Sequence, residues 1–387
     1  MTLRTTLDFL LLYWLDAPAL SARPRFAEHS AETFGAVLDT CERIARDRFA
    51  PYNRLVDTQE PRTEVGPDGA LRVVLPEATH AAHAAYAQSG MLGAAQDAEV
   101  GGMQLPYTIE AAANAFFAHA SVSIGSGMLT TGNANLLMVH GTPAQQRVFA
   151  AKEFAGEWSG TMCLSEPQAG SSLSDVTTRA VPDGDGFEAD PLGPRYRLRG
   201  HKMWISAGEH ELTDNIVHLV LAKIADDQGR LVPGVKGISL FIVPKFLVND
   251  DGSLGPRNDV LLAGLFHKMG WRGTTSTALN FGDNGDCVGY LVGKPHHGLS
   301  YMFQMMNEAR IGVGMGAVML GYAGYLYSLD YARQRPQGRL PDGKDPTSNQ
   351  VAIIEHADVR RMLLTQKAYV EGAFDLGLYA ARLFDDT

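Results

Sequence analysis

The residues best suited to chemistry stand in one short run, TMCLSEPQAGSS, which begins at Thr161. An apolar, strand-like segment ends at Leu164, and its backbone N–H and C=O groups can hydrogen-bond the edge of a flat heteroaromatic ring. Ser165 adds a hydroxyl beside that edge. Gly170 and Ser171 then form a small polar turn, whose backbone amides suit a phosphate or an acyl carbonyl. Taken singly, these parts are equally an ordinary strand and an ordinary turn.

A second run, GHKMWISAGE, begins at Gly200 and has matching chemistry. It supplies Trp204, a large aromatic wall, and Ser206, a second hydroxyl. A tryptophan buried in the core is the alternative interpretation. Together the two runs are typical of a site that holds a planar cofactor against a sheet.

Two other motifs are less promising. The glycine-rich run GVGMG begins at Gly312, but no strand precedes it and its spacing is not that of a dinucleotide-binding turn, so we exclude a Rossmann fold and expect helix packing. The pairs His80–His83 and His296–His297 lack carboxylate or thiol companions, and we therefore expect no metal site.

The type of secondary structure expected from the sequence changes along the chain, and these elements must position the residues described above. Residues 1–158 have helical patterns, for example Thr142 followed by Pro143, a capping residue before a proline at the first helical position. Residues 159–293 form short strands separated by glycine- and aspartate-rich turns, and residues 294–387 contain two long helical segments. We expect an α+β fold that is mostly α: an N-terminal helical domain, a middle antiparallel β domain, and a C-terminal helical bundle that is incomplete.

Composition limits the function classes. The chain has 387 residues, 45% of them hydrophobic and 20% charged, which is ordinary for a globular protein. Its formal net charge of −10 disfavours nonspecific binding to nucleic acid or to an anionic membrane. The three cysteines are far apart, which indicates a reducing compartment, and we expect a cytoplasmic protein.

The N-terminal run LDFLLLYWL, from Leu7 to Leu15, is too short to span a bilayer and lacks a signal-peptide cleavage pattern. We expect a buried helix or a docking segment there, and no membrane span.

The ordered motifs resemble the acyl-CoA dehydrogenase family over essentially the whole chain. After MCLSEPQAGSS and GHKMWISAGE come GLSYMFQMMNEARIGVG, YARQRPQGR and IIEHADVRRML. The N-terminal segment and the form MNEARIGVG resemble the large-type subfamily, whose members have extended N- and C-termini. The resemblance implies the family's fold and an FAD-dependent α,β-dehydrogenation of an acyl-CoA thioester to a 2-enoyl-CoA, as in fatty acid metabolism.

For the cofactor, the resemblance implies that FAD lies against the β domain. The residues expected to contact FAD are Met162, Leu164, Ser165, Gly170, Trp204, Ser206 and, across a subunit interface, Arg335. The last implies a homodimer or homotetramer, and electron-transfer flavoprotein is the expected electron acceptor.

For the substrate, the resemblance implies contacts from Ser171, Met306 and Arg310, the arginine standing beside the CoA. A solvated helix-face arginine is the alternative for Arg310. The family usually has Asp after the residue matching Ser171, whereas this chain has Ser172, which leaves the contacts of that turn open.

The usual catalytic base of the family, a glutamate in a motif near the C-terminus, has no match in this chain. Glu308 is a weak candidate, because some members carry the base immediately before the arginine that matches Arg310, where this chain has Ala309. One residue changes the direction of a helical side chain by ~100°. Asp385 and Asp386, at the end of the chain, are expected to be frayed. A separate chain could supply the missing segment. The alternatives are a non-catalytic flavin- or CoA-binding subunit and an acyl-CoA oxidase.

Overall fold

The computed structural model describes residues 2–67, 69–125, 127–249, 251–343 and 345–386. The backbone divides into two compact units. Unit 1 comprises Met1–Arg46, Leu105–Val122 and Ile311–Thr387, and unit 2 comprises Asp47–Gln104 and Ser123–Arg310. The three sequence-based domains, 1–158, 159–293 and 294–387, stay a prediction.

Ten α-helices and twelve β-strands are assigned within the described residues, with short 3₁₀ and π turns between them. The helices are α1 (Leu3–Phe9), α2 (Ala31–Ile44), α3 (Asn53–Thr58), α4 (Glu77–Gln88), α5 (Tyr107–Ser121), α6 (Met128–His140), α7 (Pro143–Gln145), α8 (Ala151–Phe154), α9 (Gly298–Gln334) and α10 (Ala357–Asp386). The strands are β1 (Arg62–Val65), β2 (Leu71–Val74), β3 (Trp158–Cys163), β4 (Arg179–Pro182), β5 (Arg195–Ser206), β6 (Asn215–Ile224), β7 (Ile238–Pro244), β8 (Phe246–Val248), β9 (Leu254–Arg257), β10 (Val260–Leu265), β11 (Ser276–Phe281) and β12 (Val288–Leu291).

Eight strands form the main sheet of unit 2. Seven follow the order β10-β11-β5-β12-β7-β6-β3, and β4 pairs with both β5 and β6. Most pairs are antiparallel, but β3 and β4 each lie parallel to β6. A parallel pair needs a long connection, and the chain supplies one by forming β4 and β5 before it returns as β6. The expected mostly helical α+β fold is confirmed, with a sheet that is mixed rather than purely antiparallel.

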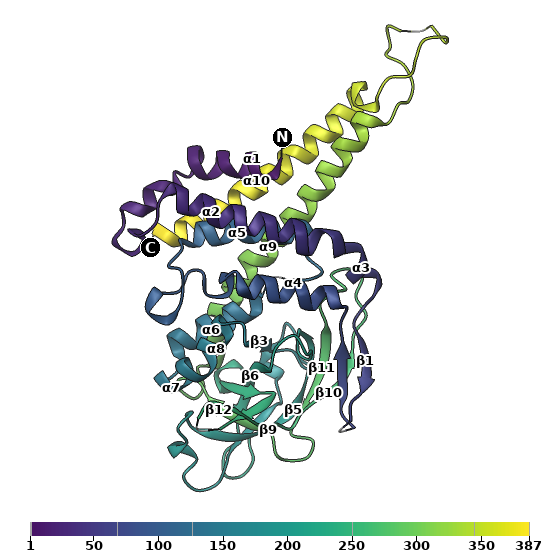
Figure 1. Cartoon of the computed structure of the whole chain (residues 1–387). Coiled ribbons are helices and arrows are strands. Elements are labelled where there is room, and N and C mark those ends of the chain that lie inside the picture. Colours follow the sequence, from purple (N-terminus) through teal and green to yellow (C-terminus); the bar gives the residue numbers. More distant parts are fainter. Residues whose placement is uncertain (1, 68, 126, 250, 344, 387) are drawn as a thin grey trace. The chain divides into compact units, whose positions relative to one another are not determined.

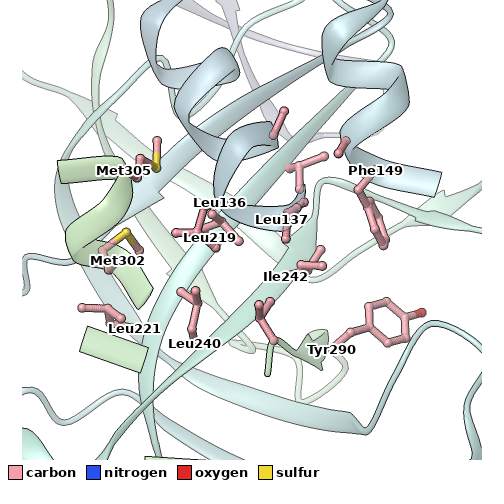
Figure 2. Close-up of a cluster of buried hydrophobic side chains, with 14 of the residues drawn as sticks. Leu136, Leu137, Phe149, Leu219, Leu221, Leu240, Ile242, Tyr290, Met302 and Met305 are labelled. Carbon is pink, nitrogen blue, oxygen red and sulfur yellow. The ribbon is translucent and has the colours of Figure 1, made fainter. Parts of the chain in front are cut away.

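Strand β6 separates two hydrophobic cores. Its side chains alternate, so Val217, Leu219 and Leu221 enter one core while Val220 and Ala222 enter the other. Figure 2 shows the first core, where Leu136 and Leu137 from α6 and Met302 and Met305 from α9 pack over the sheet residues. Because both faces are covered, β6 reads in the sequence as a nearly continuous apolar run.

In unit 1, the second half of α9 lies beside α10 (Figure 1). The rings of Tyr322 and Phe374 are 6.3 Å apart, and a Cβ built on Gly321 would lie 3.2 Å from Val370. Close helix contact was the expected role of the α9 glycines. Gly321 has this role, whereas Gly314 and Gly324 face open space.

The end of α10 is not frayed, and that expectation is wrong. The Asp385 carboxylate accepts hydrogen bonds from the backbone N–H groups of Tyr107 and Thr108, at 2.7 and 2.8 Å, and from the Thr108 hydroxyl at 2.6 Å. These N–H groups belong to the first turn of α5, which has no partner within its own helix. Asp385 therefore caps α5 from far along the chain.

The N-terminal run is partly buried. Leu7 and Leu11 are almost inaccessible, whereas Tyr13 and Trp14 are exposed. The Thr6 and Tyr322 hydroxyls are 2.9 Å apart, which joins α1 to the unit 1 part of α9. No helix among the described residues is both long enough and apolar enough to span a membrane.

Candidate functional site

The two chemistry-bearing runs meet at the ends of β3 and β5. The backbone N–H of Met203 donates to the carbonyl of Ser165 over 3.0 Å, and Lys202 Nζ donates to the carbonyl of Leu164, also over 3.0 Å. The segment that follows β3 is therefore fastened along β5. These bonds bring Ser165 beside Trp204, two residues that are distant in the sequence.

Strand β5 bulges where Trp204 stands. Ile205 pairs with Thr277 and Lys202 with Leu279, so β5 holds one residue more than β11 between these pairs. Trp204 takes up the bulge with a φ of 61°, in the left-handed region that side chains other than glycine rarely adopt. Trp204 is 56% exposed as a residue, and its ring packs on Phe266 with ring centroids 3.9 Å apart. Such backbone strain is typical of functional sites, where it fixes the direction of a side chain.

Glu166, the acid before proline, has a structural role. Its carboxylate is buried with the Lys202 ammonium, 2.9 Å away, and accepts from the backbone N–H groups of Thr177 and Thr178. Burial alone would raise its pKa, but the Lys202 charge and these hydrogen bonds outweigh burial and lower the pKa of Glu166 to about 2. Glu166 therefore holds the turn after β3 in place, and it is a poor proton acceptor.

Near the turn that Glu166 and Lys202 hold in place, some polar groups remain free to bind a ligand. Met162, Leu164 and Ser165 are half-buried, and Ser206 is exposed. Within the described part of the chain, the hydroxyls of Ser165 and Ser206 have no hydrogen-bond partner. Apolar walls, two free hydroxyls and an exposed indole fit a planar ring with polar edges.

The turn at Gly170 and Ser171 is exposed. The Ser172 hydroxyl donates to the Asp175 carboxylate over 2.6 Å, and Lys223 Nζ donates to the Ser174 carbonyl over 2.8 Å. Ser172 thus closes the turn through Asp175, three residues further along. A Cβ built on Gly170 would meet nothing within 4 Å, so this backbone can be approached closely.

Phe303, Met306 and Arg310 lie along one side of the first turns of α9, but they differ in exposure. Arg310 and Phe303 share an exposed face, with the guanidinium 5.6 Å from the ring centroid, and Asn307 accepts a hydrogen bond from Arg310 over 2.7 Å. Met306 is half-buried and packs against the sheet core. Arg310 and Met306 are therefore not equally accessible.

Glu308 lies on the other face of α9. It is about 200° around the helix from Arg310 at ~100° per residue. Its carboxylate accepts from the Asn135 amide over 2.9 Å, and Asn135 accepts from the Gln96 amide over 2.6 Å. Burial raises the pKa of Glu308 to about 7, although the Asn135 hydrogen bond opposes this. The structure thus places Glu308 in a polar network with α6, away from the arginine.

Arg335 belongs to unit 1 and follows directly after α9. Its side chain is exposed and bonds the carbonyl of Pro336, while its own carbonyl accepts from the N–H of Ile353 over 2.9 Å. The residue is thus held at the base of the loop between α9 and α10.

Sequence reasoning missed several residues that build the site. Lys202 neutralises Glu166, Phe266 supports Trp204, and Asn133 binds the carbonyls of Thr161 and Val217, at 3.1 and 2.8 Å. A lysine amid the apolar residues of HKMWIS was an available signal, since a buried lysine needs an anion. Phe266 and Asn133 carry no local signal. In the described ranges, no three His, Cys, Asp or Glu side chains gather where they could hold a metal ion.

Comparison with known proteins adds independent findings. No family model matches the chain. The 3-methylmercaptopropionyl-CoA dehydrogenase of Ruegeria pomeroyi is 39% identical over 362 residues, which are 93% of this chain and 58% of that protein. A butyryl-CoA dehydrogenase of Syntrophomonas wolfei is 35% identical over 388 residues, 98% of this chain and 61% of that protein. The chain thus spans about three fifths of the length of these relatives.

Solved structures share the fold at low identity. The butyryl-CoA dehydrogenase of Megasphaera elsdenii matches with a TM-score of 0.69 and 20% identity, covering 91% of this chain and 79% of that one. A glutaryl-CoA dehydrogenase from Mycobacterium smegmatis in complex with FADH2 matches with a TM-score of 0.65 and 19% identity, covering 91% and 76%. From the curated relatives and this shared fold, the chain belongs to the acyl-CoA dehydrogenase family.

Proposed function

We propose that this chain forms the FAD- and acyl-CoA-binding part of an FAD-dependent acyl-CoA dehydrogenase. The proposal rests mainly on the proximity of Ser165 to the strained Trp204. The hydrogen bond from the backbone N–H of Met203 to the carbonyl of Ser165 holds these two segments together. The motifs on both strands and the identity of the curated relatives support it.

The cofactor would lie against the ends of β3 and β5. Backbone groups at Met162, Leu164 and Ser165 would bond the polar edge of the ring, and Trp204 with Ser206 would flank it. FAD, when bound, would accept the hydride that leaves the β-carbon of the acyl chain. The chain's own part is to hold the ring's orientation, and the Glu166–Lys202 pair provides the rigidity for this.

The substrate would be an acyl-CoA held by Arg310, Met306 and Ser171. Arg310 is exposed, and its planar fork suits a phosphate of the CoA nucleotide. Gly170 and Ser171 offer backbone amides on an exposed turn, toward phosphate or thioester. The half-buried Met306 would border the acyl chain.

The α-proton of the substrate needs a base from elsewhere. The Glu308 carboxylate bonds Asn135 and lies on the face of α9 opposite to Arg310, so the proposal keeps it only as the weaker candidate. The proposal therefore includes a second candidate for the base, a carboxylate on another polypeptide segment, for example on a separate chain.

The proposal extends to partners and location. Arg335 would reach the FAD diphosphate of a second copy, which requires a homodimer or homotetramer. Electron-transfer flavoprotein would reoxidise the cofactor. The three cysteines are unpaired and buried, which supports a reducing compartment such as the cytoplasm.

The test is anaerobic titration of the FAD-loaded protein with butyryl-CoA and 3-methylmercaptopropionyl-CoA, followed by flavin absorbance. Bleaching of the oxidised band is the expected result for a complete site. Binding with a spectral shift but no bleaching supports the non-catalytic subunit, and hydrogen peroxide release in air supports the oxidase. Failure to bind FAD at all would refute the proposal.

Two variants assign the ligands in that titration. Trp204→Ala should shift the flavin spectrum and weaken FAD retention, whereas Arg310→Ala should weaken acyl-CoA binding about tenfold or more with FAD retained. Arg361→Ala, at an exposed arginine of α10, is the matched control and should change neither. Equal losses in the Arg310 and Arg361 variants would contradict the assignment.

A further inference from the structure

Two side chains buried against β3 have oxygen atoms without a hydrogen-bond donor. They are Glu153, from α8, and Asn133, from α6, and both are inaccessible to solvent. Within the described part of the chain, the two carboxyl oxygens of Glu153 and the side-chain oxygen of Asn133 have no hydrogen-bond partner. A buried polar atom without a partner costs free energy, so these oxygens require a donor.

Gly160 of β3 brings the two side chains to one point. A Cβ built on Gly160 would lie 2.2 Å from the carboxyl oxygen Oε1 of Glu153 and 2.8 Å from the amide carbon of Asn133. Both side chains therefore press on the same backbone position, where only glycine leaves room for them. The carboxyl group of Glu153 and the amide of Asn133 are thus neighbours in the core of unit 2.

The amide nitrogen of Asn133 is already fully used. It donates to the carbonyl of Thr161 on β3 over 3.1 Å and to the carbonyl of Val217 on β6 over 2.8 Å. A side-chain amide has two N–H donors, so these bonds leave its oxygen as the group without a partner. An ionised Glu153 cannot supply the missing donor, because a carboxylate only accepts hydrogen bonds.

The surroundings of Glu153 also disfavour its ionised form. Burial raises the pKa of Glu153 well above its usual range, and no charge of the described residues opposes this. The titratable residues on the neighbouring elements and on α8 itself are His140, Arg147, Lys152, Glu157 and Cys163. Lys152 pairs with Glu157 over 2.8 Å, Arg147 is exposed, and His140 stacks on Tyr301. Cys163 enters the core on the other face of the sheet.

We propose that Glu153 is a neutral carboxylic acid in the folded protein and donates its proton in a hydrogen bond to the side-chain oxygen of Asn133. One proton turns one of two facing acceptors into a donor, so that both buried groups gain a partner. Asn133 is thereby held in the orientation that ties β3 to β6 at Thr161, directly before Met162.

Glu153 is on this basis a positioning residue for the strand that holds the flavin. This consequence rests on the proposed function, whereas the proton on Glu153 does not. The two parts therefore have separate experiments.

Infrared spectroscopy of the purified chain tests the proton, whether or not FAD is bound. A neutral carboxylic acid has a carbonyl stretching band that a carboxylate lacks. At about pH 8.5, Glu308, with a pKa of about 7, is mostly ionised. Wild type should then show an acid band that is lost in Glu153→Gln. Glu188→Gln, at an exposed glutamate of unit 2, is the control and should retain the band.

The positioning role is tested by comparing Glu153→Gln with Glu153→Met. Glutamine has an N–H that can donate to Asn133, whereas methionine has a similar length and no donor. Hydrogen exchange of the β3 amides should stay within about twofold of wild type in the glutamine variant and be about tenfold faster or more in the methionine variant. The dissociation constant of FAD should rise about tenfold in the methionine variant only.

Two results would overturn the proposal. An acid band that survives Glu153→Gln would show that Glu153 is ionised. Equal exchange rates of β3 in the glutamine and methionine variants would show that Glu153 only fills space. If exchange separates the two variants but even the wild-type chain binds no FAD, the hydrogen bond to Asn133 is supported and the proposed function fails.

Discussion

The ends of β3 and β5 differ from the outer face of α10 in how fully their side chains are buried and hydrogen-bonded. At the strand ends, a buried carboxylate has an ammonium and two backbone N–H groups as partners, and one tryptophan is held in a strained conformation. On α10 the backbone is regular, and apolar side chains are left in water. Because the buried carboxylate has its hydrogen-bond partners, the local geometry is fixed, as the binding of a small ligand requires. Because the apolar side chains of α10 are incompletely buried, covering them would provide free energy for a contact with a macromolecule.

The largest effect is expected from breaking the buried pair on the strand side. Lys202→Met leaves the Glu166 carboxylate buried without its counter-ion, which should lower the free energy of unfolding by about 3–5 kcal/mol. Urea unfolding followed by tryptophan fluorescence measures this. Lys236→Met, at an exposed lysine, should change it by less than about 0.5 kcal/mol. A loss below about 1 kcal/mol for Lys202→Met would show that the pair is not the anchor of the turn.

The next effect concerns Glu308 and depends on pH. The pKa of Glu308 in the folded protein, about 7, lies above its value in the unfolded chain. Its contribution to the free energy of unfolding is therefore fully present below about pH 4.5 and is lost as pH rises through 7. The loss attributable to this group should be about 3 kcal/mol, at 1.36 kcal/mol per pKa unit.

Glu308→Gln removes this proton-linked step. The difference in unfolding free energy between wild type and variant should therefore change between pH 5 and 8 by about that amount. A difference that stays constant over this interval would mean that the carboxyl ionises in the folded protein as it does in water.

On the unit 1 side, Asp385→Ala should cost about 1–2 kcal/mol, because the first turn of α5 loses its cap. Hydrogen exchange should show faster exchange of the amides of Tyr107 and Thr108 than in wild type. Asp227→Ala, in an exposed turn, is the control. Unchanged exchange at both amides would contradict the capping role.

The smallest effect contrasts the strained backbone at the end of β5 with the regular backbone of a long helix, α9. At position 204, glycine should be more stabilising than alanine by about 1 kcal/mol, because only glycine adopts positive φ without cost. At Leu320, inside α9 and also exposed, the preference should be reversed by about the same amount. Four variants and their urea midpoints decide this, and the same sign at both positions would exclude backbone strain at Trp204.

Local patterns were sufficient to predict many elements. Helical patterns were expected in residues 1–158, which hold helices α1 to α8, and the strand-rich middle was recognised from its turns. The capping sequence at Thr142 is present as a capping box with Gln145. Each of these depends on neighbours within a few residues.

The parts that were not predicted depend on distant partners. Asp385 caps α5 across 277 residues, and nothing near either residue indicates the contact. The parallel pairing of β3 with β6 and the supporting role of Phe266 likewise arise only when the sheet is assembled. For the site, the residue types on the two strands were recognisable from the sequence. The direction in which Glu308 points was not, because it is set by the packing of α9 on α6.

The parallel pairing of β3 has a consequence for biosynthesis. Trp158 pairs with Asn215, so a nascent chain exposes an unpaired apolar strand until β6 has left the ribosome. At 5–20 residues per second this takes several seconds. Met302 and Met305, which help to close the same core, emerge later still. The segment that we propose to hold the flavin is thus among the first parts of the sheet to be made and among the last to be enclosed, so its apolar side chains are exposed for much of synthesis.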